Sequence, residues 1–249
     1  MFLSKKMVLG CKVIMFDSLL TNASLGVNEI KLKELLTIRS EYYPNSKIST
    51  LFPPVEIGSI TLVDQIVLLS LGQLIDPEKL VEIGTYLGYS TSVLAMNLKN
   101  TEIFTVDLPK AEEVDNLTFD EGSIYNDGVE NDNFLRKKQQ VDGEVYLKEL
   151  SESELNRVNL IKHDSTKLDF KQTFDDASFV FIDGGHEHHI IEQDTINARS
   201  IIKRGVIVWH DFGSNIHGDV TEYLHSLTDR KIFHVMGSLC AFELIGYGA

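Results

Sequence analysis

The chain has 249 residues, of which 43% are hydrophobic and 24% are charged. These fractions are typical of a globular protein and exclude a disordered chain, a collagenous repeat and a coiled coil. The 23 Lys and Arg residues against 37 Asp and Glu residues give a formal net charge of −14. A field of this sign repels nucleic-acid backbones and anionic lipid. No apolar run approaches the roughly 20 residues of a membrane-spanning helix, so we expect neither nucleic acid nor a membrane as a partner.

The two cysteines, Cys11 and Cys240, lie far apart and lack the spacing of a metal site. A disulfide framework is therefore not expected, and this usage is typical of a reducing cytoplasm. Residues 5–11 superficially resemble a lipoprotein signal, but their apolar stretch is shorter than the roughly 7–15 residues that such a signal needs. We expect a cytoplasmic protein.

Residues 1–60 are expected to be irregular, apart from an amphipathic helix that the apolar spacing predicts over residues 28–39. A strongly apolar helix is predicted over residues 62–74. From there, short apolar runs alternate with helical segments, which indicates a parallel sheet covered on both faces. The predicted strands are 80–83, 103–106, 158–161, 179–182, 206–209, 232–235 and 239–244, and the clearest further helices are 90–98 and 190–202.

The last two predicted strands are separated by Met236, Gly237 and Ser238, which is typical of a hairpin. The expected fold is therefore α/β, with a Rossmann-like doubly wound, mostly parallel sheet, an antiparallel C-terminal strand and helices on both faces. Residues 1–60 would be a helical extension, serving as a cap or as a contact in a homo-oligomer. Residues 61–249 would form the main domain.

Residues 108–157 form an insertion that is longer than one crossover helix requires. Within it, residues 111–132 carry eight acidic residues and no Lys or Arg. Long loops in globular domains are usually functional lids or solvated insertions, and both interpretations stay open here.

The most informative segment is residues 81–91, VEIGTYLGYST, in which a buried strand runs into a turn containing Gly84 and Gly88. Glycines let the backbone approach a ligand closely, and a following helix, which Ser90 is placed to cap, offers N–H groups to an anion. The spacing differs from the Gly-x-Gly-x-x-Gly of a pyrophosphate site, so a carboxylate-bearing ligand suits it better. Asp107 ends the next strand and is placed to accept hydrogen bonds from ribose hydroxyls.

A second group of polar residues follows two later strands. Asp183 and Asp211 each end an apolar strand, with one predicted helix between them, so we expect them on neighbouring parallel strands at the edge where ligands bind. Two carboxylates there can hold Mg²⁺; the alternative is that they are cofactor-site or helix-capping acids. His186 follows Asp183 by three residues, and an imidazole is well suited to remove a proton near neutral pH.

The remaining histidines are not predicted to be catalytic. His210 adjoins Asp211 and could belong to the same group, whereas ordinary structural roles are expected for His188, His189, His217 and His234.

Together, residues 81–91, Asp107 and residues 163–165, 181–186 and 206–212 resemble class I S-adenosylmethionine (SAM)-dependent methyltransferases. The resemblance covers roughly residues 60–245. It extends to the metal-dependent branch that contains the catechol, caffeoyl-CoA and macrolide-sugar O-methyltransferases.

The resemblance implies that SAM is the cofactor. Its methionine part would be surrounded by Gly84, Thr85, Tyr86, Gly88 and Ser90, with Glu82 beneath it. Asp107 would bind the ribose, while Asp164 and Ser165 would flank the adenine.

The resemblance also implies that Asp183 and Asp211 bind the metal, with Asp183 and His186 as catalytic residues and His186 as the general base. The family usually places an Asn or an acid directly after the second Asp, where this chain has Phe212. The match is therefore incomplete at the metal site.

The expected function is O-methylation of a small-molecule hydroxyl with Mg²⁺-assisted deprotonation. Two alternatives stay open. A nicotinamide-dependent oxidoreductase on a related fold is disfavoured by the missing Gly-x-Gly-x-x-Gly. A non-catalytic module that binds the cofactor is disfavoured by the presence of Asp183, His186 and Asp211. The expected partner is a small-molecule acceptor, which the sequence does not name.

Overall fold

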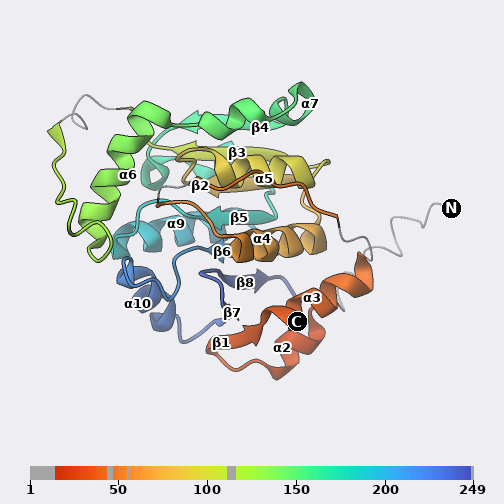
Figure 1. The fold of residues 1–249 in the computed structure, drawn as a ribbon. Helices are drawn as coiled ribbons and strands as arrows, with labels where there is room; N and C mark the ends of the chain where they lie inside the picture. Colours follow the sequence, from red (N-terminus) through yellow and green to blue (C-terminus); the bar gives the residue numbers. More distant parts are fainter. Residues whose placement is uncertain (1–14, 44–46, 55–56, 111–115, 248–249) are drawn as a thin grey trace.

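A single eight-stranded sheet organises the part of the chain that the structure describes. The structure, a computed structural model, describes residues 15–43, 47–54, 57–110 and 116–247. The strands lie in the order β1-β7-β8-β6-β5-β2-β3-β4 (Figure 1). They are β1 (Gly26–Lys31), β2 (Lys79–Ile83), β3 (Glu102–Asp107), β4 (Val158–Lys162), β5 (Phe179–Ile182), β6 (Gly205–Trp209), β7 (Lys231–Met236) and β8 (Ala241–Ile245).

Helices cover both faces of this sheet. They are α2 (Asp17–Asn22), α3 (Leu32–Tyr42), α4 (Leu62–Ile75), α5 (Tyr89–Asn97), α6 (Gly128–Asp142), α7 (Glu152–Leu155), α8 (Phe170–Thr173), α9 (His188–Ile201) and α10 (Gly218–Ser226), with 3-10 turns η2 (Val145–Glu149) and η3 (Ser165–Lys167). Apolar side chains of α2 to α5 form one core with one face of the sheet, and those of α8 to α10 form a second core with the other face. Figure 1 shows α4 and α5 in front of the strands.

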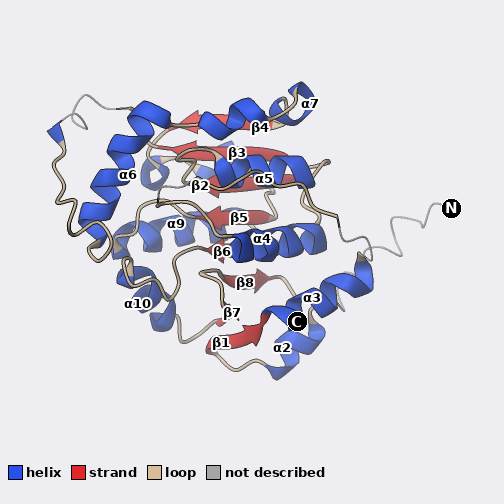
Figure 2. Cartoon of the chain, in the orientation of Figure 1, coloured by secondary structure: helices blue, strands red, loops and turns tan. Residues whose placement is uncertain are grey.

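The strand directions confirm the expected doubly wound α/β fold. All neighbouring pairs are parallel except β6 with β8 and β7 with β8, so β8 is the antiparallel C-terminal strand. Every residue of β5 and β6 is buried, as expected for parallel strands that are covered on both faces. In Figure 2 the arrowheads of β3 and β4 point towards the side where α6 lies, and that of β8 points away from it.

The helix predicted over residues 28–39 is wrong at its start. Residues 28–31 belong to β1, which pairs in parallel with β7, and α3 begins only at Leu32. The apolar positions Ile30 and Leu32 are two residues apart, which fits a strand as well as the edge of a helix. Hydrogen bonds to β7, which is distant in the sequence, decide between them. One strand of the sheet therefore comes from residues 1–60.

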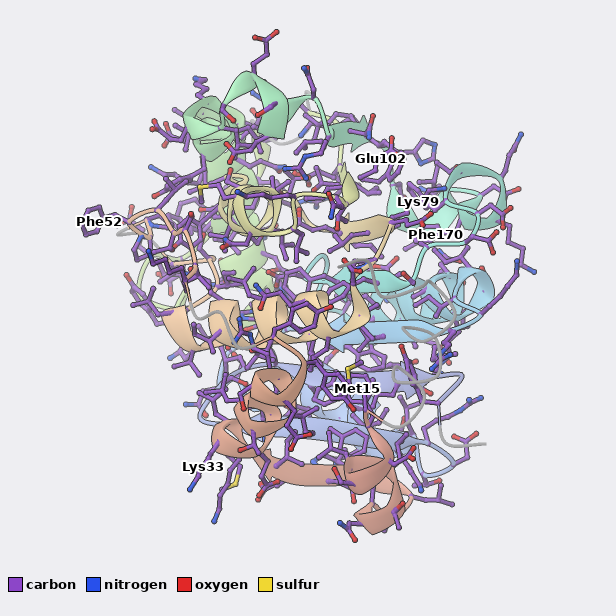
Figure 3. All side chains as sticks on the ribbon, turned by 90° about the vertical axis from the view of Figure 1, so that its right-hand side faces the viewer. Met15, Lys33, Phe52, Lys79, Glu102 and Phe170 are labelled. Atoms are coloured by element: carbon purple, nitrogen blue, oxygen red, sulfur yellow. The ribbon has the colours of Figure 1, made fainter. Side chains whose placement is uncertain are left out.

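The parallel strands begin at one edge of the sheet and end at the opposite edge. Figure 3 views the molecule from the side where Lys79 and Glu102 begin β2 and β3, and Phe52 projects away from the body there with 95% of its surface exposed. The carboxyl ends of the parallel strands lie on the opposite side. That opposite side is where ligands bind in open α/β sheets.

Two further expectations concern the cysteines and the membrane. Cys240 is a buried free thiol, whereas Cys11, like the whole of residues 5–11, lies outside the described residues. Among the described helices, none has the length and apolarity to cross a membrane.

Arg157 connects the start of β4 to the end of α5. Its guanidinium donates hydrogen bonds to the carbonyl oxygens of Ala95, Leu98 and Thr101, at 2.6, 2.8 and 2.9 Å. Cationic side chains satisfy the unpaired carbonyls of a helix C-terminus and complement its dipole. Arg157 thus fixes the far end of the helix whose first turn lies at the candidate site.

We expect Arg157→Met to lower the free energy of unfolding by about 2–3 kcal/mol, because charge-assisted hydrogen bonds are lost while the carbonyls stay partly buried. Urea denaturation measures this. Lys203→Met is the matched control, since it removes only the exposed ion pair with Asp176 and should leave stability unchanged. Equal effects of the two substitutions would contradict the role given to Arg157.

Candidate active site

The candidate site lies where the backbone hydrogen-bond ladder continues one residue past the strand ends. Asp183 N–H donates to Ile83 O at 2.8 Å, and His210 N–H donates to Ile182 O at 3.0 Å. Because β5 and β6 are parallel neighbours, the segments that follow them emerge side by side. Asp183 and Asp211 therefore lie at adjacent strand ends, as the sequence predicts.

The two glycines of the turn after β2 are required by the protein itself. A Cβ on Gly84 would overlap the carbonyl oxygen of Asp183, and one on Gly88 would lie 2.9 Å from Cγ of Leu147. Their φ values are +100° and +77°, which glycine adopts without strain. Close packing of the backbone thus gives both glycines an internal reason, and their contact with a ligand stays a prediction.

The expected capping role of Ser90 is wrong. Gly88, in the left-handed conformation, is the N-cap of α5, and Ser90 is the second helical residue. The side chain of Ser90 is buried beside Glu82, as is that of Thr91, whose hydroxyl donates to the Glu82 carboxylate. Thr85 is also turned inwards, with its Oγ1 at 2.6 Å from Oγ1 of Thr105. These hydroxyls form a buried polar layer beneath the turn.

Glu82 is the charged centre of this buried layer. Burial raises the pKa of its carboxyl group to about 7, although the hydroxyls of Ser90, Thr105 and Thr91 act in the opposite direction. Its side chain has no exposed surface. A ligand at this place would therefore contact the turn above Glu82 and not its carboxyl group. Glu82 lies beneath the turn, and its place beneath the methionine part of SAM stays a prediction.

Asp107 ends β3 and faces the same edge. Its carboxylate accepts hydrogen bonds from Tyr86 N–H at 3.1 Å, from Leu108 N–H at 2.9 Å and from the Gln139 amide of α6. The Lys162 ammonium lies 3.6 Å away. Burial raises the pKa of Asp107, partly offset by Lys162. Gln139 thus pairs with the carboxylate that is predicted to bind ribose hydroxyls.

A cavity of about 380 Å³ adjoins Asp107. Its lining includes several cationic side chains and the predicted adenine-site residue Asp164: Leu108, Pro109, Lys110, Arg136, Gln139, Gln140, Lys162, His163, Asp164 and Lys167. Asp164 also caps η3, which begins with Ser165, by accepting hydrogen bonds from the N–H and hydroxyl of Thr166. The cavity wall thus contains Asp164, whereas Ser165 is outside the lining.

Asp211 lies among three imidazoles. Its Oδ2 is 3.0 Å from Nε2 of His186, 3.2 Å from Nδ1 of His217 and 3.3 Å from Nδ1 of His210. Nδ1 of His210 also lies 3.1 Å from Oδ1 of Asp183. Burial would raise the pKa of Asp211, but these imidazoles hold it well below its usual range. Asp211 has a φ of +62°, a strained conformation that often marks functional sites.

His186 and His217 form a stacked pair. Their rings are 3.5 Å apart and parallel to within 2°. Nδ1 of His186 hydrogen-bonds to Oδ1 of Asp132 at 2.8 Å, and Nε2 of His217 lies 3.5 Å from the same oxygen. Burial lowers the pKa of His186, but Asp132 and Asp211 outweigh it and raise the pKa to about 10. The pair thus bridges two carboxylates.

The sequence interpretation missed Asp132 and undervalued His217. Asp132 belongs to α6 in the acidic insertion, and His217 precedes α10, so neither lies at a predicted strand end. His188 and His189 are exposed, in line with the plainer role expected for them. The one signal for Asp132 in the sequence is the acidic character of residues 111–132, but that character does not show which acid reaches the strand ends. Residues 111–115 lie outside the described part of the chain.

The buried carboxyl of Glu82 makes stability pH-dependent. The pKa of about 7 in the folded protein exceeds that of the unfolded chain, so the folded state keeps a proton that the unfolded state has lost. Stability from this group is therefore complete below about pH 4.5 and decreases by up to about 3 kcal/mol as the pH rises through 7. Glu82→Gln should remove this decrease.

Urea denaturation between pH 5 and 8 tests this expectation. Asp194 is also buried with a pKa raised to about 7. The Glu82→Gln variant should therefore keep part of the dependence of unfolding free energy on pH that the wild type shows. Glu102→Gln, at an exposed position, serves as the control. An unchanged slope in Glu82→Gln would contradict a protonated Glu82.

The comparisons with known proteins agree with the fold. A family model described as "Methyltransferase domain" matches residues 81–212, and no curated protein matches the sequence. The chain is similar to the solved structure of the O-methyltransferase TomG from Streptomyces achromogenes in complex with SAM (TM-score 0.52, 14% identity, covering 99% of this chain and 100% of that chain). It is also similar to cofactor-bound Rv0187 from MTB (TM-score 0.51, 16% identity, 86% and 91% covered).

At these identities, the similar structures establish the fold alone, and the family model carries the assignment. The matched segment runs from β2 through the glycine turn and Asp107 to the residue after Asp211. It covers more than half of the chain and agrees with the resemblance to class I methyltransferases. The protein belongs to this methyltransferase family.

Proposed function

We propose that the protein is a SAM-dependent methyltransferase that methylates a hydroxyl group of a small molecule. The observation that carries this proposal is a juxtaposition at one edge of the sheet. Asp107 and its cavity lie at the end of β3, and the group formed by Asp183, His186 and Asp211 lies beyond the neighbouring strands β5 and β6. Cofactor and acceptor would meet between them.

The residues present fit the cofactor. Asp107 offers a carboxylate to ribose hydroxyls, provided that Gln139 releases or shares it, and Asp164 borders the adjoining cavity. The backbone of residues 84–88 passes between Asp107 and Asp183. SAM supplies an electrophilic methyl group, so the protein needs to position the acceptor and remove its proton rather than form a covalent intermediate.

The donor set at Asp183 and Asp211 fits a divalent cation, but it fits Mg²⁺ poorly. Mg²⁺ prefers oxygen ligands, whereas the nitrogen Nδ1 of His210 lies 3.1–3.3 Å from both carboxylates. A divalent cation held there would supply positive charge that lowers the pKa of an acceptor hydroxyl and offsets the charge of Asp211.

His186 is the proposed general base, oriented by Asp132. Its Nδ1 hydrogen-bonds to Asp132, and its buried Nε2 faces Oδ2 of Asp211 at 3.0 Å. With Asp132 and Asp211 both beside it, the pKa of about 10 keeps His186 protonated at neutral pH. Its action as a base therefore requires the Asp211 charge to be offset. His186 then accepts the hydroxyl proton at Nε2 while Asp132 holds Nδ1–H.

Cofactor binding tests the first half of the proposal. S-adenosylhomocysteine should bind the wild type with measurable heat in titration calorimetry and raise its melting temperature by mass action. Asp107→Ala should weaken binding by at least tenfold, because the acceptor for the ribose hydroxyls is lost. Asp142→Ala, at an exposed ion pair with Lys138, is the control. Binding of NAD but not of S-adenosylhomocysteine would overturn the proposal.

Turnover tests the second half. Methyl transfer from labelled SAM to a panel of small phenols, catechols and sugar hydroxyl compounds should give product with at least one acceptor. His186→Ala should slow that transfer about 10²–10⁴-fold, the usual effect of losing a general base, with S-adenosylhomocysteine binding intact. His189→Ala, which changes an exposed neighbour, should match the wild type. Cofactor binding without transfer to any acceptor would favour a non-catalytic module.

A further inference from the structure

The imidazole of His210 lies between the two carboxylates at the ends of β5 and β6. Its Nδ1 is 3.1 Å from Oδ1 of Asp183 and 3.3 Å from Oδ2 of Asp211, and the three side-chain atoms lie within 4.8 Å of one another. Only 7% of the His210 surface is exposed. Two oxygen atoms and one nitrogen atom thus surround one point at the sheet edge.

Asp64, from the first turn of α4, fixes the orientation of the His210 ring. Its Oδ2 lies at hydrogen-bond distance, 3.3 Å, from Nε2 of His210. The Asp64 carboxylate is itself held by Thr61 N–H at 2.8 Å and Leu239 N–H at 2.8 Å. An Nε2–H that donates to Asp64 leaves the lone pair on Nδ1, facing Asp183 and Asp211. Metal-ligating histidines commonly donate their other ring N–H to a carboxylate in this way.

Nδ1 of His210 lies at ion-pair distance from both carboxylates. Within the described part of the chain, this buried nitrogen has no hydrogen-bond partner, despite its proximity to two carboxylates. Two atoms that each lie about 2.1 Å from one cation are about 3.0 Å apart at a right angle and about 3.4 Å apart at the tetrahedral angle. The two N–O separations fall within that range. These distances allow the three side chains to bind one shared cation.

The ligand types identify the class of cation. Imidazole suits Zn²⁺, Fe²⁺ and related ions, whereas Mg²⁺ favours oxygen ligands alone. Phe212, at the position where an oxygen ligand was expected, is buried against the rings of His225 and His234 and offers no donor. His210, on the other side of Asp211, supplies the third ligand instead.

We propose that Asp183, His210 and Asp211 bind a transition-metal dication of the class of Mn²⁺, Fe²⁺, Co²⁺ and Zn²⁺ in preference to Mg²⁺, with Asp64 positioning His210. The second group of possible ligands, Asp132, His186 and His217, is less suitable, because the lone pairs of two parallel stacked rings do not converge on one point. The inference deepens the proposed function, on which its catalytic relevance rests. Metal binding itself can be measured without SAM or an acceptor.

The test uses the full chain, stripped with chelator and titrated with Co²⁺, Zn²⁺ or Mg²⁺ in a calorimeter. The wild type should bind one Co²⁺ or Zn²⁺ per chain at least 100-fold more tightly than Mg²⁺. His210→Asn should weaken Co²⁺ binding at least tenfold and reduce the preference over Mg²⁺, because it exchanges the nitrogen ligand for an amide. His189→Asn is the control and should bind as the wild type does.

A spectroscopic measurement separates the positioning role of Asp64 from a merely structural one. In the Co²⁺ protein, the Nε2–H of a ligating His210 should give an exchangeable, hyperfine-shifted proton signal that is absent from His210→Asn. Asp64→Asn should weaken Co²⁺ binding about 10–100-fold and speed the solvent exchange of this signal, while circular dichroism shows an unchanged fold.

The outcomes are distinct. Equal affinity for Mg²⁺ and Co²⁺, or wild-type Co²⁺ affinity in His210→Asn, would overturn the nitrogen ligand. Absence of any dication binding would overturn the metal site as a whole. Selective metal binding without methyl transfer would instead defeat the proposed function and leave the metal site standing.

Discussion

The alignment of the parallel strand ends is the constraint on which the site depends. The pairs β2–β5 and β5–β6 each add one backbone hydrogen bond beyond their last paired residues. Asp183 N–H donates to Ile83 O, and His210 N–H donates to Ile182 O. These bonds fix the level at which the side chains leave the sheet, so Asp107, Asp183 and His210 open onto one edge. Helix α6 closes that edge at two places, with Gln139 on Asp107 and Asp132 on His186.

Charge compensation at this edge is local. The chain is strongly acidic as a whole, and carboxylates crowd the ends of β5 and β6. Histidines rather than lysines or arginines surround Asp211 there: His186, His210 and His217 all lie within 3.3 Å of it. An imidazole can give up its proton and still serve as a ligand or a base, which a lysine or arginine cannot do so readily near neutral pH. The site is therefore built from groups that can exchange protons.

The sequence predicts most of the sheet because β5 and β6 are buried on both faces and therefore read as unbroken apolar runs. It also predicts that Asp183 and Asp211 are neighbours, since acids at the ends of consecutive parallel strands must meet. It could not predict β1, whose partner β7 lies about two hundred residues away. Nor could it predict Asp64, Asp132 and His217, because α4, α6 and the segment before α10 reach the site only through tertiary packing.

Gly84 has a consequence for how such sequences are compared. Any side chain there would collide with the Asp183 backbone, so the sheet needs this glycine whether or not a ligand binds. Purifying selection on the fold alone would preserve it in a descendant that had lost methyl transfer. The turn would then survive as a record of ancestry. Evidence that a relative still has the activity must come from positions that the backbone leaves free to vary, such as Asp107 and His186.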